Sequence, residues 1–257
     1  MNKAPVYVSV VFLSILAVNS RIIGSEIDVV SNESPGVDVR EFIKLESEFR
    51  ELLQRTNFLI AIGDWEYFSK QDQNKARLWS SSAFAASSGK DKAGFMITAG
   101  HAFMNFNPNP QVVVFFPKNP ANLHLIPIQE INKYSSGMLD VAAYPFDENM
   151  KSLLTPMSFG NVSTLELYQP LAIFCSPLKF LEPVRVGFFS GIIRGVGHEY
   201  LLIKFSGIGA ANYCSGAPVV DREGKIYGML VRADDHTGYA VPANIIEEFL
   251  DEKYFKK

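Results

Sequence analysis

The sequence contains few of the residues that would mark a disulfide-rich, metal-binding or nucleic-acid-binding protein. Two of its 257 residues are cysteine and four are histidine. Two cysteines are too few for a disulfide scaffold, and the histidines are scattered without the spacing of a zinc site. The net charge is -3, and no basic stripe with interleaved aromatics is present. We therefore expect no cofactor, no metal and no nucleic-acid partner.

Long apolar runs are also missing, apart from one short stretch near the N-terminus. Val6 to Val18 is almost entirely apolar, but its length of about 13 residues falls short of the roughly 20 that a membrane helix needs. Lys3 precedes the stretch and Ser20 follows it, as in a secretory signal peptide. Residues 1–20 are therefore either a cleaved signal peptide or an uncleaved membrane anchor. Both interpretations predict an exported protein, periplasmic or secreted, and only the second predicts membrane contact.

The remaining composition is that of an ordinary globular protein, with 47% hydrophobic residues. We expect residues 21–57 to form a linker and an amphipathic helix, the helix covering about 39–55. The helix either binds a partner or packs on its own domain, and the second interpretation is favoured because most apolar stripes face a core. Apolar residues spaced by three and four predict this helix: Phe42, Leu45, Phe49, Leu52 and Leu53.

From residue 58 to the end, the pattern predicts one domain, 58–257, that is all-β. Short apolar runs are separated by Gly, Pro, Asn and Asp, which is typical of a sandwich or barrel. A helix should close the chain, with Asn244 as its N-cap and Glu247 three residues later. The predicted strands are 95–98, 112–116, 141–144, 171–174, 184–189, 201–205 and 226–231.

Three short segments carry residue types used in acyl transfer. Gly94–His101 is an apolar strand that runs through small residues into a histidine. In Leu139–Tyr144, Asp140 opens an otherwise apolar strand, and its carboxylate is able to orient an imidazole. Asn212–Pro218 places Ser215 in a loop of small residues, where a carbonyl group can approach a hydroxyl. Each segment taken alone is weak evidence, because a histidine after a strand or a turn aspartate is usually structural.

Together the three segments resemble the signature blocks of chymotrypsin-fold serine peptidases. They occur in that family's order of His, Asp and Ser, whereas subtilisins and α/β-hydrolases use other orders. Further segments over about residues 78–250 resemble the HtrA/Deg-like branch, although no PDZ domain is expected here. The blocks that carry this likeness are Ser82-Ala-Phe84, Ala172-Ile-Phe-Cys-Ser-Pro177, Phe189-Ser-Gly-Ile-Ile193 and Gly238-Tyr-Ala-Val-Pro-Ala-Asn244.

The resemblance implies two antiparallel six-stranded β-barrels with a catalytic triad in the cleft between them. His101 would be the general base, Asp140 the residue that orients it, and Ser215 the nucleophile. Backbone N–H groups of Tyr213 and Ser215 would form the oxyanion hole. A cysteine nucleophile at Cys214 is the less favoured alternative, since the Gly-Ala-Pro sequence follows Ser215.

Two departures from the family pattern affect the loop before the nucleophile. Tyr213 stands where the family has glycine, so the oxyanion hole is either misformed until a partner or substrate binds, or intact with Tyr213 in allowed angles. Cys214 replaces an acidic residue. The resemblance brings Cys175 close to this loop, and Cys175 and Cys214 are either bonded to each other or free and buried.

The expected function is a serine endopeptidase that acts on polypeptide substrates through an acyl-enzyme. The substrate pocket should be lined by Gly209, Val231, Arg232 and Ala233, with no carboxylate at its base, which predicts cleavage after small apolar residues. The alternative is a catalytically silent or partner-activated pseudopeptidase that acts as a binding protein. A structural β-protein without a cleft is a third, weaker alternative.

Overall fold

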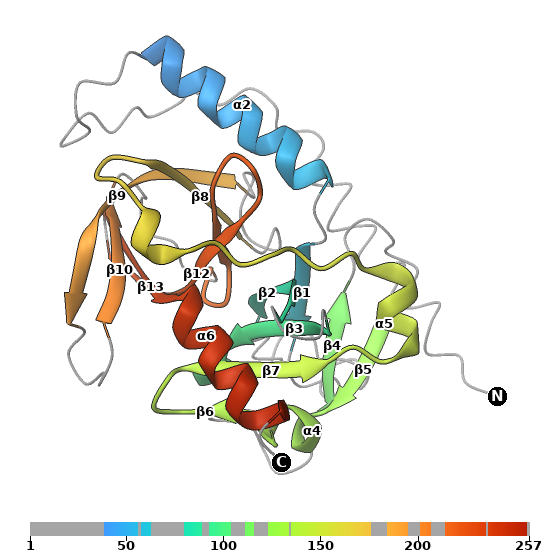
Figure 1. Ribbon diagram of the computed structural model, residues 1–257. Coiled ribbons are helices and arrows are strands. Elements are labelled where there is room, and N and C mark those ends of the chain that lie inside the picture. Colours follow the sequence, from blue (N-terminus) through green and yellow to red (C-terminus); the bar gives the residue numbers. More distant parts are fainter. Residues whose placement is uncertain are drawn as a thin grey trace, which may run out of the picture.

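The protein folds into two antiparallel β-structures that pack against each other, with one helix near each end of the described chain (Figure 1). The all-β prediction, with two antiparallel halves and a helix near each end, is confirmed. The computed structural model describes residues 39–55, 58–62, 80–88, 93–103, 111–115, 123–133, 135–175, 184–194, 201–206, 214–234 and 236–255. The predicted signal peptide or anchor, the predicted linker before the first helix, Gly209 and Tyr213 lie outside these residues.

The first half is a seven-stranded antiparallel sheet with the order β5-β4-β1-β2-β3-β7-β6. It has one strand more than the six we expected, and β6 is only two residues long. Two short helices, α4 (Ile128–Asn132) and α5 (Glu148–Leu153), accompany it. The strands are β1 (Phe58–Ile62), β2 (Ser80–Ser87), β3 (Gly94–Ala99), β4 (Gln111–Phe115), β5 (Leu123–Pro127), β6 (Ser135–Ser136) and β7 (Val141–Pro145).

The second half is a closed six-stranded barrel with the order β10-β13-β12-β11-β8-β9. Its interior is filled by residues that alternate along the strands, such as Leu171, Ile173, Ile203 and Phe205. This alternation is what allows the barrel to have a packed core. The strands are β8 (Pro170–Phe174), β9 (Val184–Arg194), β10 (Leu201–Ser206), β11 (Pro218–Val220), β12 (Ile226–Ala233) and β13 (Thr237–Pro242).

A continuous hydrophobic core joins the two halves. It contains Phe84 and Ile97 from the first sheet and Phe174 and Met229 from the barrel. The segment between the halves is also bonded to both of them, because Met157 pairs with Ala85 and Ser87 of β2 while the next residues pair with Ile226 of β12. The halves are therefore fixed relative to each other by packing and by backbone hydrogen bonds.

The N-terminal helix α2 (Val39–Arg55) lies over the barrel, against β9 (Figure 1). Leu45 and Phe49 are buried, and Leu52 packs on the same core. Glu48 extends from the helix to Arg222 of the barrel, at 3.5 Å between carboxylate and guanidinium. The apolar stripe of α2 thus packs on its own domain, which is the interpretation that the sequence favoured.

The closing helix α6 (Ala243–Leu250) buries Ile246, Phe249 and Leu250 in the core between the halves. The prediction that Asn244 caps this helix is wrong. The N-cap is Pro242, with no side-chain cap, and Asn244 lies exposed within the first turn. The helix begins two residues before the position that the capping pattern suggested because β13 continues directly into it.

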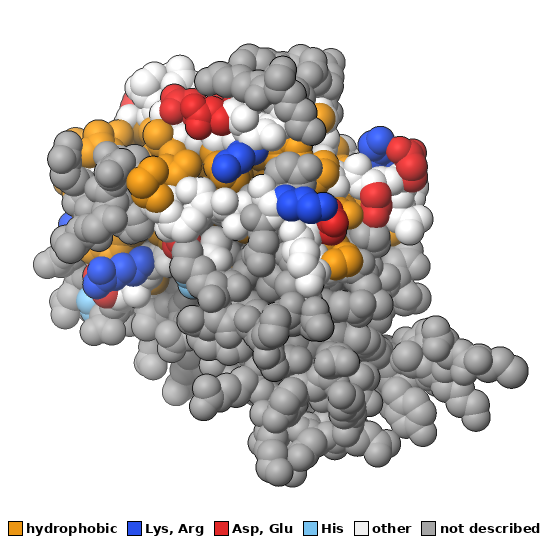
Figure 2. Space-filling view, turned by 90° about the horizontal axis from the view of Figure 1, so that it is seen from below, with side chains coloured by type: hydrophobic (Ala, Val, Ile, Leu, Met, Phe, Trp, Pro, Cys, Tyr) orange, Lys and Arg blue, Asp and Glu red, His pale blue; other side chains and the backbone are white. Residues whose placement is uncertain are grey.

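The described surface carries charges of both signs. On the face shown in Figure 2, Lys and Arg side chains lie as separate groups, several of them beside Asp or Glu, with hydrophobic side chains between them. Within the described ranges, no helix is long and apolar enough to cross a membrane.

Candidate active site

The first part of the candidate site is the turn where β3 ends. Ala99 is the last residue of β3, and the 3-10 helix η1 (Gly100–Phe103) follows at once. The backbone N–H of Gly100 donates to the carbonyl oxygen of Asp140 at 3.0 Å. Because β3 pairs with β7 up to Ala99 and Val141, His101 and Asp140 are brought together by the register of this one sheet.

Asp140 holds His101 through both its backbone and its imidazole ring. Asp140 Oδ1 accepts the backbone N–H of His101 at 2.7 Å. The ring nitrogen Nδ1 lies 2.8 Å from Asp140 Oδ2 and 3.0 Å from Oδ1. With Nδ1–H donating to the carboxylate, the lone pair of Nε2 is left free to accept a proton. The imidazole is half-exposed while the carboxylate is nearly buried.

Asp140 adopts a left-handed backbone conformation, with φ 54°. Aspartate tolerates this region better than most residues because its short side chain can bond locally. Here the carboxylate accepts the backbone N–H of His101, which is distant in sequence but adjacent in space. The left-handed turn aims the carboxylate at η1, and a bulky or β-branched residue would resist it.

Ser215 lies in a tight turn between Cys214 and Ala217, on the barrel side of the site. The N–H of Ala217 donates to the carbonyl oxygen of Cys214 at 2.8 Å, which closes the turn. Gly216 has φ 83°, the positive value that a type II turn requires at its third residue. Gly216 N–H then donates to Leu230 of β12 at 2.8 Å, so the turn is anchored on the barrel.

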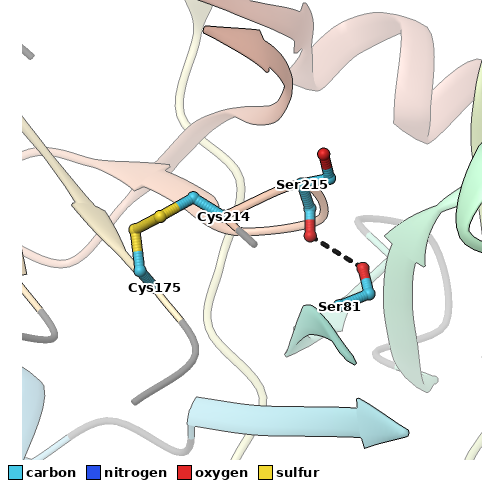
Figure 3. Close-up of a disulfide and its surroundings, with 4 residues drawn as sticks. All are labelled: Ser81, Cys175, Cys214 and Ser215. Carbon is cyan, nitrogen blue, oxygen red and sulfur yellow. Dashed lines mark hydrogen bonds between the residues drawn. A yellow bond between two sulfur atoms is a disulfide. The ribbon is translucent and has the colours of Figure 1, made fainter. Parts of the chain in front are cut away.

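A disulfide bond joins Cys214, the residue before Ser215, to Cys175 at the end of β8 (Figure 3). Both cysteines are fully buried. Of the two possibilities left by the sequence, the bonded pair is therefore the one observed. The bond excludes Cys214 as a free thiol nucleophile in this oxidised state, and it ties the nucleophile loop to the barrel wall.

The carbonyl oxygen of Ser215 faces the first sheet, and the hydroxyl of Ser215 points away from that sheet (Figure 3). That carbonyl accepts the backbone N–H of Ser82 at 2.9 Å and the hydroxyl of Ser81 at 2.7 Å. Both donors belong to β2, which pairs with β3, the strand that leads to His101. Between the described residues His101 and Ser215, no direct hydrogen bond is formed, and catalytic bonds of this kind are often long without substrate.

Of the predicted pocket residues, three lie at the end of β12. Val231 is buried in the core between the halves, whereas Arg232 is exposed and holds its guanidinium 5.9 Å from the centre of the Tyr239 ring. Ala233 is partly exposed. With Gly209 outside the described residues, their role as a substrate pocket stays a prediction.

A separate groove of about 820 Å³ lies where β9, β10 and the start of α6 meet. Its lining includes Ile192 and Leu201, which are exposed large hydrophobic residues, and Glu247. Burial raises the pKa of the Glu247 carboxyl, and the nearby Asp251 raises it further. None of the three candidate catalytic residues lines this groove, so it is not part of the candidate active site.

Comparison with solved structures identifies the fold. The structure of the HtrA-type protease AlgW with tripeptide superposes with a TM-score of 0.60 at 16% identity, covering 81% of this chain and 64% of that one. The chain has the fold of HtrA-type proteases. Structures of an AlgW variant give similar values, 0.58 with a tripeptide and 0.59 with a decapeptide.

These likenesses are limited in sequence and in length. The AlgW variant with tripeptide is 16% identical, over 78% of this chain and 61% of that chain, so this chain spans less than two thirds of it. The variant with decapeptide is 15% identical, over 81% and 68%. No family model matches the sequence, and no curated protein matches it in sequence.

Among the described residues, no cluster of His, Cys, Asp and Glu has the arrangement of a metal site. The sequence analysis did not single out two buried hydroxyl groups near Ser215, those of Ser81 and Thr98. Ser80-Ser-Ser82 is the kind of polar run that usually predicts a loop, and here it opens strand β2. Thr98 is fully buried, and the signal available in the sequence was a polar residue within an otherwise apolar run.

Proposed function

We propose that this protein is a serine endopeptidase, with Ser215 as nucleophile, His101 as general base and Asp140 as the residue that orients the base. The observation that supports this most strongly is the His101–Asp140 pair, with Nδ1 at 2.8 Å from the carboxylate. That contact leaves Nε2 as the proton acceptor. The bonds from β2 to the carbonyl of Ser215 add support, because they hold the nucleophile loop against the same sheet.

The reaction follows from these roles. Ser215 Oγ attacks the carbonyl carbon of the scissile peptide bond, and His101 Nε2 takes the hydroxyl proton. Backbone N–H groups of Ser215 and Tyr213 stabilise the negative oxygen of the tetrahedral intermediate. The carbon–nitrogen bond then breaks, and the leaving amine takes the proton from His101. Water repeats the sequence on the acyl-enzyme and releases the carboxylic acid product.

The substrate proposed is a polypeptide, cleaved after a small apolar residue. The peptide-bound AlgW structures of the same fold support a polypeptide as the class of substrate. The preference for small apolar residues rests on the sequence, which has Gly209 and no carboxylate at the position where the resemblance places the base of the pocket. Dominant cleavage after arginine or lysine in a peptide library would contradict it.

Export to the periplasm or the cell exterior belongs to the same proposal. Buried disulfides are typical of proteins folded in oxidising compartments, and Cys175–Cys214 is one. The apolar stretch from Val6 to Val18 agrees with export. Fractionation of cells that express the full chain tests it, since a disulfide-bonded protein found in a reducing compartment would contradict the proposal.

Covalent labelling with a fluorophosphonate tests the enzymatic function. The oxidised protein should be labelled stoichiometrically, and Ser215→Ala should lose all labelling while Ser152→Ala, a change at an exposed serine of α5, should keep it. An unlabelled protein with a normal thermal unfolding transition would overturn the proposal. It would favour the alternative from the sequence, a pseudopeptidase that binds partners or needs one to form its oxyanion hole.

A further inference from the structure

Two buried hydroxyl groups lie directly beneath the nucleophile turn, on the side of the first sheet. Ser81 Oγ is 2.7 Å from the carbonyl oxygen of Ser215 and 3.0 Å from Thr98 Oγ1. Thr98 Oγ1 is in turn 2.8 Å from the carbonyl oxygen of Ser82. Ser81 is 4% exposed and Thr98 is fully buried, so water does not satisfy these groups. They form a polar contact at the interface between the sheet and the barrel.

The number of hydroxyl protons and the contact distances together indicate which oxygen atom accepts each proton of this cluster. Each hydroxyl has one proton, and the carbonyl oxygens of Ser82 and Ser215 accept only. Thr98 lies closest to the Ser82 carbonyl, at 2.8 Å, and donates to it. Ser81 Oγ has three acceptors within reach, the Ser215 carbonyl at 2.7 Å, Thr98 Oγ1 at 3.0 Å and the Ser82 carbonyl at 3.2 Å, and we assign its proton to the shortest of these contacts, the Ser215 carbonyl. The Ser215 carbonyl therefore has two donors from β2, the Ser81 hydroxyl and the Ser82 backbone N–H.

Ser81 and Thr98 lie on β2 and β3, and β3 leads directly to His101, the proposed general base. Thr98 pairs with Ala83 across β2 and β3, and β3 ends one residue before η1, which contains His101. A hydrogen bond from β2 to Ser215 therefore fixes the position of the proposed nucleophile relative to β2 and β3, the strand pair that leads to His101. The Ser215 hydroxyl points away from this contact, so Ser81 acts on the backbone and not on the reacting oxygen (Figure 3).

The turn has little freedom to shift toward the sheet. A Cβ atom added at Gly216 would lie 2.1 Å from the carbonyl oxygen of Ser82 and 2.9 Å from Ser81 Oγ. On the opposite side, the disulfide holds Cys214 to β8 (Figure 3). Loss of the Ser81 hydroxyl would leave a gap on one side only, with the Ser82 N–H as the remaining donor from β2.

We infer that Ser81 is a positioning residue for Ser215, a role that rests on the proposed peptidase function. Its hydroxyl fixes the orientation of the Ser215–Gly216 peptide group and, through it, the direction of the Ser215 side chain toward His101. Catalysis depends steeply on such alignment, because a small displacement of a reacting group lowers the rate even when folding is intact.

The experiment compares two variants that each remove one buried serine hydroxyl. Ser81→Ala removes the donor to Ser215. Ser88→Ala is the matched control, since Ser88 is 3% exposed, follows the same strand, and its hydroxyl has no hydrogen-bond partner in the described part of the chain. Each protein is labelled with a fluorophosphonate, and both the rate constant and the final labelled fraction are measured.

For Ser81→Ala, we expect a rate constant about tenfold below wild type, the ratio that corresponds to one ordinary hydrogen bond, with full final labelling. On a peptide substrate, kcat should fall while KM stays close to wild type. Ser88→Ala should match wild type in rate. An unchanged rate constant with a lower final fraction in Ser81→Ala would show a purely structural role and overturn the inference.

If Ser81→Ala does not fold, Ser81→Cys replaces it in the test. The thiol fills the site but is a weak donor, so the rate should again fall with full final labelling. A wild-type rate in Ser81→Cys would overturn the inference without affecting the proposed function. Absence of labelling in folded wild-type protein would instead overturn the proposed function and the inference with it.

Discussion

The two halves of the candidate site are held in different ways. On the sheet side, His101 and Asp140 are joined next to paired strands by four contacts that involve only these two residues and Gly100. On the barrel side, Ser215 is held both through its own carbonyl oxygen and through the neighbouring residues of its turn. Its turn is bound to β12, to β8 through a disulfide, and across the interface to β2. The proposed base is therefore a local unit, whereas the position of the proposed nucleophile depends on the interface between the two halves.

This difference predicts distinct consequences for damage to each side. Changes at the base should reduce catalysis with little effect on stability, because few elements meet there. Changes around the nucleophile should reduce stability and catalysis together, because the same contacts hold the two halves in place. The four predictions below test this comparison, and they are ordered by their expected effect on catalysis, from the largest to the smallest.

Asp140→Asn should have the largest effect on catalysis. Asparagine tolerates the positive φ of this position and retains an oxygen acceptor for the His101 N–H. Its amide group, however, donates to Nδ1 and selects the tautomer with the proton on Nε2. We expect kcat to fall by about 10³ to 10⁴, as for a triad with the wrong tautomer. Thermal unfolding should be close to wild type, and a large loss of stability would contradict the description of the base as a local unit.

Gly216→Ala should damage both properties at once. Its Cβ would lie 2.1 Å from the Ser82 carbonyl oxygen, and its φ of 83° is unfavourable for alanine. We expect a loss of about 2–3 kcal/mol in the free energy of unfolding, and a rate lower by about 100-fold. Denaturant titration and labelling kinetics measure the two effects.

Gly191→Ala is the matched control for that change. Gly191 also has a positive φ, of 128°, but nothing lies within 4 Å of its Cβ position. It should lose about 1–3 kcal/mol of stability from backbone strain alone, with no change in labelling rate. If both variants lose activity equally, backbone strain and not the interface contact would be responsible.

Removal of the disulfide should weaken the barrel side alone. Its cysteines are 39 residues apart, and closing a loop of that size stabilises a protein by about 3–4 kcal/mol in the chain-entropy model. The double variant Cys175→Ala, Cys214→Ala should therefore unfold at lower denaturant and label Ser215 more slowly. Reduced wild-type protein should behave in the same way. Unchanged labelling by both would show that β2 and β12 suffice to hold the turn.

Glu247→Gln should have the smallest effect and lies outside both halves of the site. Burial and Asp251 raise the pKa of this carboxyl, so its charged form is disfavoured in the folded protein. The cost is present at neutral pH and disappears as pH falls below the ordinary glutamate range. We expect Glu247→Gln to raise Tm by about one or two degrees at pH 7, with no gain at pH 4. Labelling of Ser215 should be unchanged, and a changed rate would link the groove to the site.

The sequence by itself determined seven of the thirteen described strands, the helix near each end and the three segments from which the candidate site is proposed. Runs such as 141–144 and 171–174 became β7 and β8 because alternating or continuous apolar residues encode a buried strand locally. The stripe of α2 was equally readable, since Leu45 and Phe49 lie one turn apart. Six described strands were not predicted, namely β1, β2, β5, β6, β11 and β13. In β2 the small alanines and the serines give only a weak apolar signal, although tertiary burial makes Ser82 and Phe84 fully inaccessible.

Only the tertiary structure decided how these pieces meet. It paired Cys175 with Cys214, placed α2 on the barrel and moved the start of α6 to Ala243. It also brought Ser81 to the Ser215 carbonyl, across 134 residues of chain. Local sequence records the preferences of neighbouring residues, whereas a contact between distant residues is selected by the packing of whole sheets. The residues of the candidate site could therefore be proposed from the sequence, whereas the hydrogen bond from Ser81 to the Ser215 carbonyl could not.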